Sequence, residues 1–230
     1  MLRVQRYVGC HLSAIAMVKE KAANLLSNVQ LGVGVSDGCE AIIHTVKGQL
    51  QEDNQDLVVS HLDYVNTFNL ADRGAGFKEV KEHFSELSHL VAIYYGVAAH
   101  LIFSDSIIPS TRGWHQGAVL ATLLYSFGQR PVTFKLNEEI PRLHANGWIL
   151  NNGLLAGSEK DVSKVLQILQ ADGPALGLHL STENCITIHL LPPGGEGGDA
   201  HPPQGDDVVD QEDPQPLLQV RHCPDILLVR

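Results

Sequence analysis

Apolar residues recur every three to four positions in several stretches of this chain, the spacing of one face of an α-helix. A run over 119–127 is more uniformly apolar and also predicts a helix, which we expect Gly128 and Pro131 to end. Ser158 precedes another periodic stretch and is a typical N-terminal cap, with Gly173–Pro174 at its far end. The remaining helices are expected over 12–29, over 37–50, and as one or two helices around 77–91.

Shorter apolar runs predict β-strands at 57–62 and 186–191, and two hairpins over 100–109 and 147–155. In the second hairpin, Asn152–Gly153 between apolar arms favours a type I′ turn. After the early helices the order is strand, helix, helix, strand pair, helix, strand. This order resembles the split βαβ arrangement of ferredoxin-like sheets. We therefore expect an α+β fold with an antiparallel sheet and helices on one face.

The composition changes sharply after residue 191. Residues 192–216 contain six of the chain's 11 prolines, five glycines and seven acids, but no lysine or arginine. Such a segment cannot bury enough apolar surface to offset the cost of ordering it, so we expect disorder. Of the net charge of -10, the rest of the chain carries -3. That mild acidity counts against strong unaided binding to a nucleic-acid backbone.

The four cysteines lack a CxxC spacing, which favours reduced, buried thiols in an intracellular protein, nuclear or cytoplasmic. No apolar run reaches the roughly 18 residues of a membrane-spanning helix, so we expect no membrane partner. The glycine-punctuated segment 30–38 lacks the lysine of a phosphate-binding loop and is interpreted as a plain connector. No HExxH or GxSxG motif occurs, so zinc-protease and hydrolase functions are not indicated.

Asp63 is the first candidate for a functional residue, because it leaves the buried strand at 57–62 and is followed by Phe68. A carboxylate at such a place is costly to bury unless it binds a cation or hydrogen-bond donors. An isolated acid there would cap the next turn. We interpret Asp72–Arg73 as a local ion pair rather than as a second catalytic acid.

Four blocks of sequence together resemble the palm of a reverse transcriptase of the non-long-terminal-repeat retrotransposon type. They occur in that family's order and spacing, and they read LDYVNTFNLADR, GWHQGAVLATLLYSF, ANGWILNNGLLAGS and GPALGLHLSTENC. The resemblance implies that Asp63 is a metal-binding acid and that Phe68 discriminates the sugar of a nucleotide. It also implies that Gly113, Gln116 and Gly117 contact the template and the incoming nucleotide.

The resemblance extends to both ends of the chain. QLGVGVSDGCEAIIH and RYVGCHLS, the latter with Arg6, are similar to parts of the fingers, and PDILLV looks like the start of a primer-grip strand. The implied domains are partial helical fingers over 1–56 and a palm over 57–191. The acidic segment 192–216 and a primer-grip remnant over 217–230 follow.

The family's catalytic residues are incomplete in this sequence. Asn151 and Asn152 occupy the positions of the acid pair, and Asn184 occupies that of a lysine proposed to donate a proton. Phosphoryl transfer in this family would use two metal ions, and Mg²⁺ requires hard, charged oxygen ligands. Because Asp63 is the one motif acid that remains, we expect a domain without polymerase activity.

The sequence leaves three alternatives open. In the first, the chain is a weakly active RNA-directed DNA polymerase that uses Mg²⁺, an RNA/DNA primer-template and deoxynucleoside triphosphates. Or it is a non-catalytic domain that binds nucleic acid or an unknown protein partner. Or it is a transposon relic with no selected function.

Overall fold

The computed structural model describes residues 2–26, 29–51, 56–191 and 217–222, with side chains for 12–26, 29–51 and 56–190. Two sequence predictions lie outside these residues: the disorder of 192–216 and the PDILLV strand near the C-terminus. The described chain contains helices and strands in about the predicted order. The helices are α1 (Leu2–Leu26), α2 (Gly38–Gln51), α3 (Thr67–Leu70), α4 (Arg73–His83), α5 (Ser85–Tyr95), α6 (Val119–Glu139) and α7 (Glu159–Asp172), which a 3₁₀ turn (Gly173–Leu176) follows.

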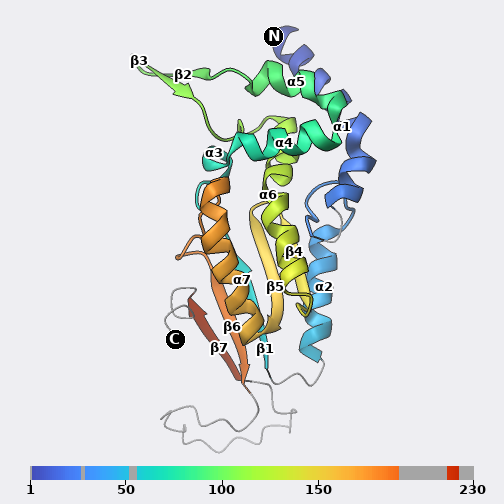
Figure 1. The fold of residues 1–230 in the computed structure, drawn as a ribbon, viewed down its shortest axis with the longest axis vertical. Coiled ribbons are helices and arrows are strands. Elements are labelled where there is room, and N and C mark those ends of the chain that lie inside the picture. The colour runs from blue at the N-terminus through green and yellow to red at the C-terminus, as the bar shows by residue number, and fades with distance from the viewer. Residues whose placement is uncertain (1, 27–28, 52–55, 192–216, 223–230) are drawn as a thin grey trace, which may run out of the picture.

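The strands form two separate antiparallel sheets. Their bounds are β1 (Leu57–Leu62), β2 (Ala99–Phe103), β3 (Ser106–Ser110), β4 (Ala145–Ile149), β5 (Asn152–Ser158), β6 (Ile186–Leu191) and β7 (Leu217–His222). The larger sheet has the order β4-β5-β1-β6-β7, and β2 and β3 form a hairpin of their own. Figure 1 shows this hairpin extending from the body beyond α5. The predicted α+β fold with an antiparallel sheet is confirmed.

The candidate acid Asp63 follows directly after the central strand β1, which lies beside the β4–β5 hairpin in the sheet. Strand β1 pairs with β5 so that Leu57 lies opposite Ser158 and Leu62 opposite Gly153. Because Gly153 is next to the β4–β5 turn, residue 63 leaves the sheet beside that turn. The register thus places Asp63 next to Leu150 and Asn151, the residues of that turn.

Consecutive residues of the strands point to opposite faces of the sheet. Leu155 of β5 belongs to the main core with Leu166 of α7, whereas Ala156 packs in a smaller cluster with Ile42 of α2. The helices α6 and α7 lie along one face in Figure 1. Helix α2 covers part of the opposite face, where Leu57 of β1 is buried, Val59 is half-buried and His61 is exposed.

Helix α6 is longer than the sequence predicted. It runs from Val119 through Gly128 and Pro131 to Glu139. An internal proline normally costs about 3 kcal/mol because it removes one hydrogen bond and crowds the preceding turn. Val132 and Leu136 beyond it are buried in the core, and this burial offsets the cost.

The predicted type I′ turn at Asn152–Gly153 is wrong. Ile149 pairs with Asn152, so Leu150 and Asn151 form the turn, and Leu150 has a positive φ of 56°. Gly153 instead lies within β5, where an added Cβ would approach the ring of Trp148 to 2.8 Å. The glycine therefore makes room for this tryptophan and does not form the turn.

Two other features of the described chain bear on the sequence predictions. Cys185 is buried and reduced, as expected, but Cys39 is exposed. None of the helices in the described part combines the length and apolar character that crossing a membrane requires.

Candidate functional site at the end of strand β1

The backbone of Asp63 is held by the segment that precedes β6. The amide of Ser181 donates to the carbonyl oxygen of Asp63 at 2.8 Å. The amide of Asp63 in turn donates to the Sγ of the buried Cys185 at 3.4 Å. These contacts place the Asp63 side chain between the β4–β5 turn and the loop before β6.

Both carboxylate oxygens of Asp63 accept hydrogen bonds from asparagine side chains. The Nδ2 of Asn151 donates to Oδ1 at 2.7 Å, and the Nδ2 of Asn184 donates to Oδ2 at 2.9 Å. The side chain is thus bound to distant segments and does not cap the next turn. Asn151 stands at one of the positions predicted for the acid pair, and Asn184 stands at the position predicted for a lysine. The structure brings both side chains into contact with Asp63, the residue predicted to bind metal.

The second asparagine of the pair is placed differently. Asn152 is exposed at the start of β5, opposite Ile149. Of the two, Asn151 is the one that donates to Asp63. Among the described residues, no group of three His, Cys, Asp or Glu side chains is arranged to hold a metal ion. Of the three side chains that meet at this strand end, Asp63, Asn151 and Asn184, Asp63 is the one that carries a charge.

A hollow of about 290 Å³ brings three other predicted site residues together. Its lining residues come from α3, from the loop before α6 and from the first turn of α6: Phe68, Gln116, Gly117, Ala118, Val119, Ala121 and Thr122. The Phe68 ring stacks on Tyr125 with a centroid distance of 5.0 Å. Burial raises the pKa of Tyr125, and the nearby Tyr64 and Asp63 raise it further, so this phenol stays neutral.

Gly113, the other glycine of the predicted site, packs tightly against α3 and is not among the residues that line this hollow. Its φ of 68° and its close approach to the carbonyl oxygens of Phe68 and Asn69 leave no space for a Cβ. Its amide donates to the carbonyl of Ala71 at 2.9 Å. Gly113 thus fixes the loop before α6 against α3, and it does not line the hollow.

The predicted Asp72–Arg73 ion pair is wrong. Asp72 caps α4 and accepts from the amide of Ala75 at 2.9 Å. Arg73 is buried and donates to the carbonyl oxygen of Gly113 at 2.6 Å, to Arg112 O at 3.1 Å and to both oxygens of Ser110. The buried guanidinium of Arg73 therefore holds the segment that precedes Gln116 in place through hydrogen bonds to its backbone. The sequence did not indicate this role, because Asp72 next to it suggested an ion pair.

Sequence reasoning missed Gln30, which lies in the presumed connector. Its buried amide donates to Gln129 Oε1 at 2.9 Å and to the carbonyl of Leu150 at 3.2 Å, and its Oε1 accepts from the amide of Leu150 at 2.8 Å. Gln30 thereby holds both polar backbone groups of the residue before Asn151. A single polar residue between Val29 and Leu31 was the available signal.

Arg6 lies in α1, but its side chain is outside the described residues. Its predicted contact with a nucleotide or template stays a prediction.

Three solved telomerase structures have a similar fold. Telomerase from Candida albicans, in complex with a TWJ fragment of telomeric RNA, matches with a TM-score of 0.54 and 12% identity over 78% of this chain. The corresponding complex from Candida tropicalis gives 0.56 and 13% over 76%. Apo telomerase from Candida tropicalis, truncated from its C-terminal domain, gives 0.57 and 14% over 85%. The chain has a reverse-transcriptase-like fold.

The likeness concerns the fold and part of the length. This chain covers 34%, 33% and 42% of the three telomerase chains. No protein-family model matches the sequence, and no curated protein matches it. The reverse-transcriptase-like palm is therefore established by structure, whereas any activity has to be argued from the site.

Proposed function

We propose that this chain is a reverse-transcriptase-like domain of the non-long-terminal-repeat retrotransposon type that does not catalyse nucleotidyl transfer. The observation that carries this proposal is the pair of amide groups on Asp63. Asn151 and Asn184 each direct an N–H to a different carboxylate oxygen. A carboxylate can only accept hydrogen bonds, so both amides must turn their nitrogen, and not their oxygen, towards it.

The side chains at this strand end do not fit a pair of Mg²⁺ ions. Mg²⁺ takes hard oxygen ligands in near-octahedral geometry, and negative charge from carboxylates offsets its own. Here one carboxylate supplies a single charge, and both its oxygens face N–H donors. A cation placed between these groups would meet the positive ends of two amide dipoles.

Primer extension on an RNA template, with Mg²⁺ and separately with Mn²⁺, tests the proposal. We expect no template-dependent product from the wild-type chain. Product that forms with the wild type and disappears in Asp63→Ala would overturn the proposal. That outcome would support the alternative of a weakly active RNA-directed DNA polymerase.

Restoring the acids shows how much of the remaining site is competent. The double variant Asn151→Asp, Asn152→Asp places carboxylates at the two motif positions, and Asn184→Lys adds the lysine that would donate a proton. Extension gained by the double variant would mean that primer-template and deoxynucleotide still bind. Continued absence of product would mean that restoring the carboxylates next to Asp63 is not sufficient, and that binding of primer-template or deoxynucleotide is also impaired.

A second candidate function is binding of nucleic acid without catalysis. The hollow at Phe68, with the exposed Gln116 at its edge, favours it, and the two Candida complexes contain RNA. A gel shift with a primer-template duplex at increasing salt measures this directly. We expect weak binding that falls with log[salt] and falls again in Phe68→Ala, because an aromatic ring that stacks on a base is worth about 1–3 kcal/mol. Phe103→Ala, on the exposed β2–β3 hairpin, is the matched control.

A further inference from the structure

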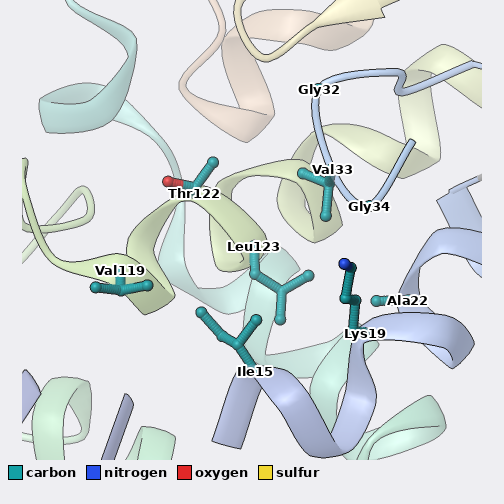
Figure 2. Close-up of a pocket in the computed structure, with 9 residues that line it drawn as sticks. All are labelled: Ile15, Lys19, Ala22, Gly32, Val33, Gly34, Val119, Thr122 and Leu123. Carbon is teal, nitrogen blue, oxygen red and sulfur yellow. The ribbon is translucent and has the colours of Figure 1, made fainter. Parts of the chain in front are cut away.

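A second cavity, of about 190 Å³, lies on the other side of the first turns of α6. Figure 2 shows it between α1, the segment 32–34 and α6. Its lining residues are Ile15, Lys19, Ala22, Gly32, Val33, Gly34, Val119, Thr122 and Leu123. It shares Val119 and Thr122 with the hollow at Phe68 but has none of that hollow's predicted site residues.

The walls of this cavity are mostly apolar, and the hydroxyl of Thr122 and the ammonium group of Lys19 are the polar side-chain groups of its lining. In Figure 2 the side chains of Ile15 and Leu123 approach each other along one side, and Val33 points in from the loop. The ammonium group of Lys19 extends towards the same loop. Lys19 is exposed and makes no ion pair with the residues that the structure describes.

The segment 32–34 is firmly seated, so the cavity is formed before any ligand arrives. Gly34 has a φ of 73°, and an added Cβ would come within 2.9 Å of the Cβ of Ala23 in α1. The amide of Gly32 donates to Gln30 Oε1 at 3.1 Å, and Gln30 is itself buried. A preformed apolar cavity loses little conformational freedom on binding.

We propose that this cavity binds a small organic monoanion, a carboxylate on an apolar aryl or alkyl body. The body would lie among Ile15, Val33 and Leu123, and the carboxylate would pair with Lys19 at the mouth. An engineered apolar cavity of about 150 Å³ accommodates benzene, so this volume suits one ring with a short chain. The lining offers no aromatic side chain on which a base could stack and one cation for a phosphate chain, so a nucleotide fits poorly.

The test uses the full chain and two probes, 4-phenylbutyrate and the neutral 4-phenylbutan-1-ol, in an NMR titration that gives a Kd for each. Both should bind to the wild type, with the carboxylate about two- to five-fold tighter, the range of an exposed ion pair. Lys19→Met keeps the aliphatic stem and should abolish this difference while the affinity for the alcohol stays unchanged. Lys47→Met, an exposed lysine on α2, should leave both affinities unchanged.

Variants that fill the cavity with a larger side chain show whether the probes bind in this cavity or elsewhere on the protein. Val33→Phe should abolish binding of both probes. If circular dichroism shows that Val33→Phe does not fold, Ile15→Phe fills the cavity from another wall and should give the same result. The proposal is overturned by lack of binding to the wild type, by binding that survives the filled variants, or by Lys19→Met weakening both probes equally. None of these readouts depends on nucleic-acid binding or on polymerase activity.

Discussion

The carboxylate of Asp63 at the end of β1 is stabilised by two neutral hydrogen-bond donors, the side-chain amides of Asn151 and Asn184. A hydrogen bond to a charged group contributes about 1.5–3 kcal/mol when buried, and less when the group is half-exposed, as Asp63 is. Asn151 and Asn184 thus satisfy both oxygens of this acid. These hydrogen bonds join the β4–β5 turn and the loop before β6 at the end of the central strand.

Gln30 should matter more for stability than its place in a loop implies. Gln30→Ala removes the partner of the Leu150 amide and of Gln129 Oε1, leaving buried polar groups unsatisfied. We expect a loss of about 2–3 kcal/mol in the free energy of unfolding, measured by urea denaturation. Gln167→Ala, an exposed glutamine on α7, should change it by less than about 0.5 kcal/mol. Equal effects of the two variants would contradict the role assigned to Gln30.

His115 should make the stability depend on pH. Burial, and then the charge of Arg73, lower its pKa, so the unfolded chain takes up this proton at a higher pH than the folded chain. The free energy of unfolding should therefore fall as the pH is lowered through the unfolded value of about 6.5.

Urea denaturation at about pH 7.5 and about pH 5.5 measures this effect. In His115→Gln the difference between the two pH values should be smaller than in the wild type. His89→Gln, an exposed histidine on α5, is the control. An unchanged difference in His115→Gln would show that other groups determine the pH dependence.

At the scale of elements, the contact between α4 and α6 depends on glycine in an asymmetric way. A Cβ at Gly76 of α4 would come within 2.6 Å of the Trp114 ring and 3.1 Å of the Leu124 carbonyl oxygen. A Cβ at Gly128 of α6 would meet its nearest neighbour at 3.6 Å, an ordinary contact. At this crossing there is therefore no room for a methyl group on Gly76 of α4, whereas there is room for one on Gly128 of α6.

These distances predict opposite outcomes for the same substitution. Gly76→Ala should destabilise the chain by about 1–3 kcal/mol, because Trp114 or α6 must shift. Gly128→Ala should be neutral or stabilise it by up to about 1 kcal/mol, because alanine favours the helix. Thermal unfolding of both variants is the measurement, and a loss at Gly128 as large as at Gly76 would contradict the packing described.

For the molecule as a whole, stability should be distributed unevenly. The strand β1 is paired on both edges and four of its six residues are buried, whereas the β2–β3 hairpin forms its own two-stranded sheet. Ile102 and Phe103 of this hairpin are 81% and 73% exposed. An isolated two-stranded hairpin is marginally stable in water.

Hydrogen exchange measured by mass spectrometry tests this distribution. Amides of β1 should exchange only on global unfolding, whereas those of β2 and β3 should exchange several orders of magnitude faster. Equal protection of the two sheets would show that another part of the molecule covers the hairpin.

Local signals in the sequence determined much of this architecture. The apolar run at 57–62, the capped amphipathic helix after Ser158 and the hairpin signals were sufficient, because propensity, periodicity and capping agree there. The motif blocks assigned Phe68, Gln116 and Gly117 to one site, and these three residues line the same hollow. Their order in the chain reflects the order of the strands and helices that carry them.

Only the tertiary structure decided the features that depend on distant partners. Helix α6 passes Pro131 because buried residues follow it, and Gly153 makes room for Trp148 instead of forming a turn. Arg73 pairs with carbonyl groups some 40 positions away, and Gln30 with a turn 120 positions away. No periodicity encodes such pairs, since their energy comes from groups that meet only in the folded chain. The two amides that donate to Asp63 belong to this class, because Asn151 and Asn184 lie 88 and 121 positions away along the chain.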